Sequence, residues 1–126
     1  MLSETLAVCQ LAPGSPVPQW AVGKGFFCLT QTADELSIVC EENRVPAGVR
    51  VERDWKALKL QGPFPFAITG VLTSFLQPLA EARVPIFAVS TFDTDYVLMK
   101  RDKVDAAIKA LAAIGHELVD SSDLAG

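Results

Sequence analysis

The sequence predicts an α+β fold in which antiparallel strands carry helices on one face. Short apolar runs of alternating character occur in pairs separated by polar turns, which is typical of β-hairpins. Two longer patterns with helical spacing occur in the second half of the chain, next to strand-like runs. From Trp55 onward the order is therefore strand, helix, strand, strand, helix, strand. This βαββαβ order is the split βαβ, or ferredoxin-like, arrangement.

The first half of the chain is predicted to be rich in strands and poor in helices. Residues 13–18 hold three prolines, which exclude a regular helix or a central strand there. Residues 42–54 are charged and contain Pro46 and Gly48, so we expect a connection without a packed helix. Strands are expected at 5–11, 26–32 and 35–41, with a short helical turn at 19–22.

The second half begins with a junction strand, expected at 55–61. Six apolar residues then fall on one face of a helix: Ile68, Val71, Leu72, Phe75, Leu76 and Leu79. Pro78 should kink or end this helix, because it removes a backbone hydrogen bond and its ring clashes with the carbonyl of Ser74.

A hairpin is expected at 86–100, where strands 86–91 and 96–100 flank a polar turn at 92–95. The second helix should have Asp102 as its N-cap and Asp105 in its first turn, and Gly115 should follow its end. Its buried stripe is predicted to contain Val104, Ile108, Leu111 and Ala112. A last strand is expected at 116–119.

The first half repeats the strands of the second half without its helices, which indicates an internal duplication. The predicted domains are a degenerate, strand-rich lobe at 1–61, a βαββαβ lobe at 55–120 and a tail at 121–126. The strand 55–61 is the junction between the two lobes.

Charge and hydropathy exclude several classes of partner. A formal net charge of −4 and a pI near 4.9 argue against nucleic acid, whose binding proteins usually present a basic face. No apolar run approaches the length of a membrane span, and residues 1–5 lack the basic start of a signal peptide. We expect a cytoplasmic protein without a nucleic-acid or membrane partner.

Cys9, Cys28 and Cys40 lie in apolar, strand-like runs. Their number is odd, there is no C-x-x-C motif, and the chain has one histidine, so a zinc site lacks ligands. We expect reduced cysteines that pack as small apolar residues.

The turn at 92–95 is the candidate site, because it combines hydroxyl and carboxylate groups. Asp93 and Asp95 are compatible with plain turn residues that bond their own backbone, or with acceptors for an ammonium group. The residues alone favour the plain turn and leave the ammonium acceptor open. With Glu41 and Glu42 these carboxylates lack the spacing of a calcium loop, so no metal site is expected.

Catalytic and phosphate-binding motifs are weak. Ser90, Asp93 and His116 have the residue types of a hydrolase triad, but a hairpin offers no strained nucleophile elbow. Residues 23–25, Gly-Lys-Gly, precede a strand and do not open a helix after one, so they fit neither a dinucleotide fingerprint nor a Walker loop. No catalytic residue is predicted.

Three stretches are more specific: S-T-F-D-T-D-Y at 90–96, E-L-S-I-V-C at 35–40, and Trp55 followed by Leu-Lys at 58–59 and Gly-Pro-Phe at 62–64. Together they resemble the small bacterial ACT-domain proteins, in the branch related to the cytosolic arginine sensors of animal cells. The resemblance covers about residues 6–119. ACT domains are ferredoxin-like modules that usually bind amino acids at interfaces between modules. The resemblance therefore implies a non-catalytic amino-acid-binding regulatory or sensor module, with its ligand between two ACT-like lobes.

The resemblance also implies where the ligand contacts lie. Asp95 would be the partner of the ammonium group, and Gly70 would let backbone amides approach the carboxylate. The full set of implied ligand-binding residues is Ser37, Ile38, Val39, Pro65, Ile68, Thr69, Gly70, Thr91, Phe92, Thr94 and Asp95.

One departure from the arginine sensors bears on the ligand. Where those sensors have a glutamate, this chain has Ile68, and a guanidinium buried there without a paired acid would be costly. We therefore expect an apolar or small amino acid and not arginine. A homodimer, an effector protein and no cofactor are further expectations. The alternatives are a small enzyme or regulatory fragment related to amino-acid kinases, and an interaction scaffold that has lost its ligand.

Overall fold

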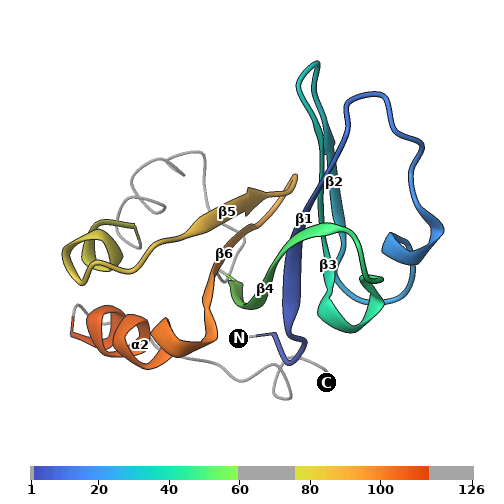
Figure 1. Cartoon of the computed structure of the whole chain (residues 1–126). Coiled ribbons are helices and arrows are strands. Elements are labelled where there is room, and N and C mark those ends of the chain that lie inside the picture. The colour runs from blue at the N-terminus through green and yellow to red at the C-terminus, as the bar shows by residue number, and fades with distance from the viewer. Residues whose placement is uncertain (1, 60–75, 114–126) are drawn as a thin grey trace. The chain divides into compact units, whose positions relative to one another are not determined.

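Figure 1 shows a computed structural model of the chain, which describes residues 2–59 and 76–113. The chain divides into two compact units. The N-terminal unit is Glu4–Trp55, and the C-terminal unit consists of Lys56–Gly126 together with Met1–Ser3. The predictions for 60–75 and 114–126, which include most of the first helix and the last strand, lie outside the described residues.

Three strands of the N-terminal unit lie where the alternating pattern predicts them. They are β1 (Leu6–Leu11), β2 (Cys28–Gln31) and β3 (Leu36–Glu41), and β3 pairs antiparallel with both of the others. The predicted helical turn is a 3₁₀ helix at Gln19–Ala21. β2 is shorter than predicted, and Phe26, Phe27 and Thr32 lie outside it.

The core of the N-terminal unit lies on one face of these strands. Leu36, Ile38 and Cys40 alternate along β3 and point toward this face. Cys9 of β1 is paired with Ile38, and residues paired across a sheet share a face. The buried cluster consists of Ala7, Cys9, Ala21, Leu36, Ile38, Cys40 and Val45.

The prediction of a connection over 42–54 is wrong at its end, because β4 spans Arg50–Lys59. The start of β4 is charged and therefore does not have the apolar pattern of a strand. It nevertheless pairs antiparallel with β1, with Val51 opposite Cys9. The register shifts before Trp55, and Asp54 there has a positive φ of 72°. This is the signature of a β-bulge. The Glu42 carboxylate accepts a hydrogen bond from the Asp54 amide at 3.1 Å and so supports the bulge.

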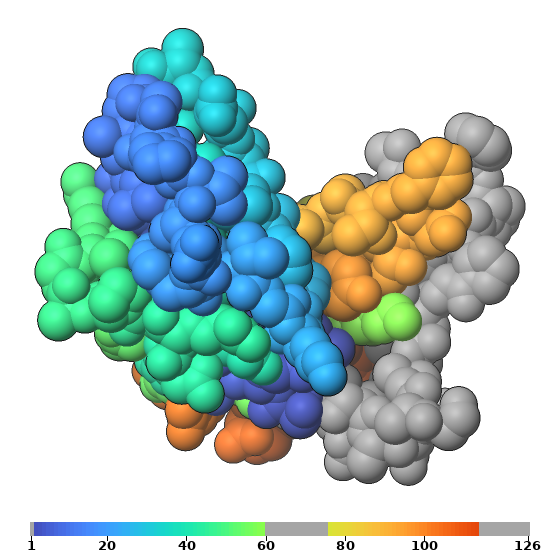
Figure 2. Space-filling view, turned by 90° about the vertical axis from the view of Figure 1, so that its right-hand side faces the viewer, coloured from blue at the N-terminus to red at the C-terminus, as the bar shows by residue number. Residues whose placement is uncertain are grey.

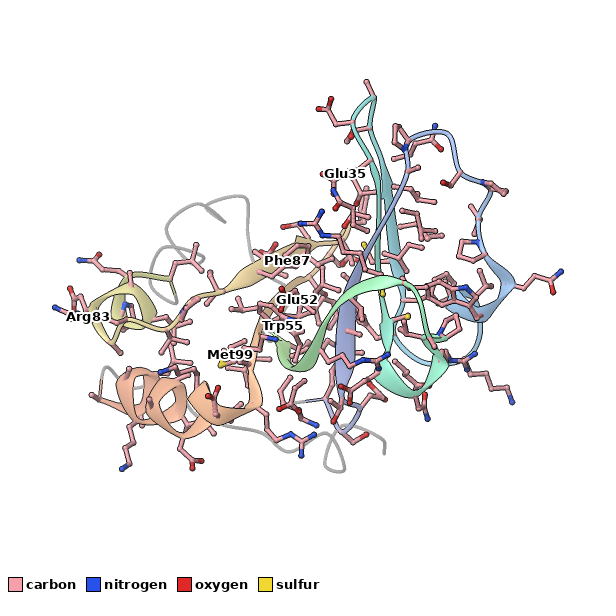
Figure 3. The ribbon with its side chains drawn as sticks, viewed as in Figure 1. Glu35, Glu52, Trp55, Arg83, Phe87 and Met99 are labelled. Atoms are coloured by element: carbon pink, nitrogen blue, oxygen red, sulfur yellow. The ribbon has the colours of Figure 1, made fainter. Side chains whose placement is uncertain are left out.

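The described part of the C-terminal unit contains the predicted hairpin and the second helix. β5 (Phe87–Ser90) and β6 (Asp95–Lys100) pair antiparallel, and the strand order is β4-β6-β5. A 3₁₀ helix at Arg101–Lys103 leads into α2 (Val104–Ala112). Figure 3 shows the Met99 side chain extending from β6 on the side of α2. The buried cluster consists of Leu58, Leu79, Val84, Val97, Met99, Val104, Ala107 and Leu111.

Residues 76–81 are helical, so the helix continues past Pro78 and ends within one turn of it. The Pro78 carbonyl accepts a hydrogen bond from the Ala82 amide at 3.0 Å. The chain then turns at Arg83, whose φ is 59°.

Two details predicted for the second helix are wrong. Asp102 lies inside the 3₁₀ helix, and the N-cap of α2 is Lys103 without a side-chain cap. Ala112 is exposed and Ala107 is buried in its place, because the core-facing positions are spaced three and four residues apart from Val104. Asp105 lies in the first turn, as predicted. None of the helices in the described ranges is long and apolar enough to cross a membrane.

Candidate functional site

The tip of the β5–β6 hairpin is a four-residue turn fixed by a threonine. The Thr91 amide donates a hydrogen bond to the Thr94 carbonyl at 2.7 Å, and the Thr91 hydroxyl donates to the same carbonyl at 2.9 Å. The Thr94 amide donates back to the Thr91 hydroxyl at 3.2 Å. These bonds close the turn around Thr91, whereas the plain-turn interpretation placed them on Asp93 and Asp95. The turn is therefore ordered without the carboxylates.

Asp95 is the first residue of β6 and not part of the turn. Side chains alternate along a strand, so Asp95 lies on the same face as Val97 and Met99, which belong to the core cluster. It is 8% exposed and is the buried charged residue among those the structure describes. The hairpin thus places a carboxylate on the core face of the sheet, where an apolar residue is expected.

Ser90 lies directly opposite Asp95, and its hydroxyl donates a hydrogen bond to Oδ1 of Asp95. β5 is the last strand in the order β4-β6-β5, so Ser90 is exposed while Asp95 is covered. The sequence pattern offered Ser90 only as a possible nucleophile. The strand register was the signal that could have identified it, because two residues flanking a four-residue hairpin turn face each other.

The other predicted residues fall into three groups. Phe92 is fully exposed and Thr94 is half-buried; both lie in the turn, directly before Asp95. Figure 2 shows the amber atoms of this hairpin on the surface. Ser37, Ile38 and Val39 lie on β3 of the N-terminal unit, and there Ile38 points into the core. Pro65, Ile68, Thr69 and Gly70 lie outside the described residues.

A second group of carboxylates lines a hollow of about 250 Å³ in the N-terminal unit, formed by Glu4, Thr5, Glu41, Glu42 and Asn43. Two of these glutamates already have structural partners. Glu41 forms an ion pair with Arg44 at 3.2 Å, and Glu42 accepts from the Asp54 amide. In the described part of the chain no three histidine, cysteine or acidic side chains are placed to hold a metal ion.

The Gly-Lys-Gly stretch has a packing role. A Cβ atom at Gly23 would overlap the Arg44 guanidinium, which also donates to the Lys24 carbonyl at 3.4 Å. Gly25 has a φ of 90°, a conformation that L side chains rarely adopt. These glycines let the loop close over the Arg44–Glu41 ion pair.

Cys9 and Cys40 pack in the core of the N-terminal unit, as predicted, whereas Cys28 is half-buried. A hydrogen bond with the Cys40 thiol, together with burial, raises the pKa of Cys9. We therefore expect iodoacetamide to alkylate Cys28 first in the folded protein, with Cys9 and Cys40 reacting after denaturation. Mass spectrometry of a labelling time course measures this order, and labelling in urea is the control. Native labelling of Cys9 as fast as that of Cys28 would contradict the packing.

Comparison with known proteins adds a family and a fold. A family model described as an ACT domain matches residues 50–113, which contain the β5–β6 hairpin and α2. A model of an N-terminal domain matches residues 4–48. A solved structure of protein Atu0741 from Agrobacterium tumefaciens is 40% identical, with a TM-score of 0.88, and the match covers 92% of this chain and 87% of that one.

Two more distant proteins are informative. The regulatory subunit of aspartate kinase from Thermus thermophilus has a TM-score of 0.63 at 11% identity, over 90% of this chain and 94% of that chain, which shows a shared fold. The cytosolic arginine sensor for mTORC1 subunit 1 from Bos taurus is 28% identical over 98 residues, 69% of this chain and 30% of that protein. The chain spans between 30% and 56% of the length of the curated relatives that it matches first.

Proposed function

The chain belongs to the ACT domain family, and from this premise we propose that it is a regulatory module that binds a free amino acid. Its α+β, ferredoxin-like fold agrees with the family, so the resemblance and fold class read from the sequence are confirmed. The bovine relative is named as an arginine sensor and the Thermus structure as a regulatory subunit. The name of the bovine relative supports a sensing role.

The observation that carries the proposal is the buried carboxylate of Asp95 on the core face of β6. A carboxylate withdrawn from water is costly unless a charged or hydrogen-bonding partner compensates it. An α-ammonium group is such a partner, and its charge-assisted hydrogen bonds are about twice as strong as neutral ones. The side chain therefore has the chemistry to recognise the ammonium end of an amino acid.

The remaining ligand contacts follow from the resemblance. We place the amino acid between the two lobes, with Ser37 and Ile38 or Val39 on one side. Thr91, Phe92, Thr94 and Asp95 contribute from the hairpin tip. The stretch Pro65 to Gly70, with Ile68, Thr69 and Gly70, completes the proposed site. Ile68 in place of an acid favours a small or apolar amino acid over arginine. A homodimer that acts on an effector protein completes the proposal.

Thermal unfolding in the presence of each proteinogenic L-amino acid at millimolar concentration tests the function. A ligand at about 100 times its Kd stabilises the folded state by about 2.7 kcal/mol, which shifts the melting temperature of a domain of this size by several degrees. We expect a small or apolar amino acid to give the largest shift and arginine to give none. The D-enantiomer of the best ligand is the matched control. If no amino acid shifts the melting temperature, the sensor proposal fails and an interaction scaffold takes its place.

A further inference from the structure

The two hairpins of the chain are built on the same turn. In the N-terminal unit the Thr32 amide donates to the Glu35 carbonyl at 2.9 Å, and the Glu35 amide donates to the Thr32 hydroxyl at 3.2 Å. The C-terminal hairpin has the same pair of bonds between Thr91 and Thr94. Each turn is four residues long and begins with a threonine whose hydroxyl accepts from the last residue. The turns 32–35 and 91–94 are therefore equivalent position for position.

The equivalence extends beyond the turns. β3 and β6 are both six residues long and have the same sequence of buried and half-buried positions. A three-residue 3₁₀ helix follows each strand directly, Glu42–Arg44 after β3 and Arg101–Lys103 after β6. The next residue is a buried valine in both cases, Val45 and Val104. The two segments therefore correspond residue by residue without an insertion. A chemical difference between two equivalent positions is then informative about function.

By this correspondence, Leu36 of the first hairpin is equivalent to Asp95 of the second, and Gln31 is equivalent to Ser90. Gln31 lies opposite Leu36 in the first hairpin, as Ser90 lies opposite Asp95 in the second. Leu36 is 2% exposed and belongs to the core cluster of its unit. The same core-facing position is thus filled by leucine in one hairpin and by a carboxylate in the other.

Stability alone favours the leucine. A buried leucine side chain stabilises the fold through the apolar area that it removes from water, whereas a buried carboxylate requires compensation. The first hairpin has leucine at this position, and the second has a carboxylate that makes the fold less stable. Such a loss of stability is typical of a functional position.

We propose that Ser90 is a positioning residue that orients the Asp95 carboxylate toward the ammonium group of the ligand, and that Gln31–Leu36 is its structural counterpart, which binds no ligand. The inference rests on the proposed function and assigns the partner of the ammonium group to one hairpin. A carboxylate has about four acceptor sites, and the Ser90 hydroxyl occupies one of them on Oδ1. This bond fixes the rotation of the carboxylate and so the direction in which its remaining acceptors point.

The test uses Ser90→Ala, Ser90→Thr and, as the matched control in the other hairpin, Gln31→Ala. The probes are the amino acid with the largest melting shift and its analogue that lacks the amino group. Calorimetry measures the affinity for the amino acid, and ligand-detected NMR measures the weaker affinity for the analogue. For Ser90→Ala we expect an affinity loss of about tenfold for the amino acid, in line with a lost hydrogen bond to a charged group, and none for the analogue. Ser90→Thr retains a hydroxyl and should stay within about twofold of the parent, as should Gln31→Ala.

The outcomes separate this inference from the function on which it rests. If the amino acid binds the parent and Ser90→Ala alike, Ser90 does not position the carboxylate and the function stands. Equal losses for the amino acid and its analogue would make Ser90 a purely structural residue and would also overturn the inference. If no amino acid binds the parent protein, the function fails and the inference fails with it.

Discussion

Replacing Asp95 with leucine should abolish amino-acid binding and, at the same time, raise the melting temperature of the ligand-free protein. The equivalent position of the first hairpin holds Leu36, so the substitution installs the side chain that this turn and register already accommodate. Burying leucine contributes about 2 kcal/mol and removes a carboxylate from the core face, which corresponds to several degrees in melting temperature. Losing a charged hydrogen-bonding partner should cost about 100-fold or more in affinity. Thermal melts and calorimetry on one preparation measure both effects.

Two matched variants sharpen this prediction. Asp93→Asn changes an exposed carboxylate in the turn that precedes Asp95 and should alter neither stability nor binding by more than about 0.5 kcal/mol. Asp95→Asn keeps the shape and removes the charge, so it should lose binding without the gain in stability that leucine brings. A lower melting temperature for Asp95→Leu would show that the carboxylate holds the fold together. Unchanged affinity would remove Asp95 from the proposed site.

The parts of the fold that the sequence predicted well are those set by local pattern. The strands β1, β3 and β6 and the turns that join the hairpins follow from alternation and turn residues within a few positions. β4 was placed too late, because Arg50, Glu52 and Arg53 read as a solvated connection. Its first half is a strand because β1 offers an edge to pair with, and that edge lies far away in sequence. Local pattern does not contain this information.

The candidate site shows the same division. The sequence drew attention to the hairpin tip but placed Asp95 in the turn at 92–95, whereas Asp95 is the first residue of β6 and lies on the core face. The role of Ser90 depended on strand register, which the length of the turn fixes but composition does not. Asp102 was a good N-cap by type, yet a 3₁₀ helix occupies that position. The first residue of a helix is decided by how the preceding chain enters it.

The reciprocal substitution, Leu36→Asp, should be the most destabilising of these substitutions, because it places a carboxylate in an apolar cluster. Removing a buried leucine costs about 2–5 kcal/mol, and an uncompensated buried charge adds to that cost. We therefore expect a loss of about 4 kcal/mol or more, enough to unfold much of the N-terminal unit, measured by urea unfolding with far-ultraviolet circular dichroism. Burial raises the pKa of the introduced carboxyl, so the destabilisation should be largest at neutral pH and should shrink as acidification neutralises the group.

The double variant Gln31→Ser/Leu36→Asp reconstructs the Ser90–Asp95 pair in the first hairpin. A serine hydroxyl opposite the new carboxylate should recover about 1.5–3 kcal/mol of the loss, because hydrogen bonds to charged groups are worth that much. Gln31→Ser alone is the control and should be nearly neutral, since Gln31 is exposed. If Leu36→Asp costs less than about 1 kcal/mol, the core face tolerates a carboxylate in either hairpin. The carboxylate of Asp95 would then have no stability cost relative to leucine. Its presence on the core face would no longer be an argument for a role in binding.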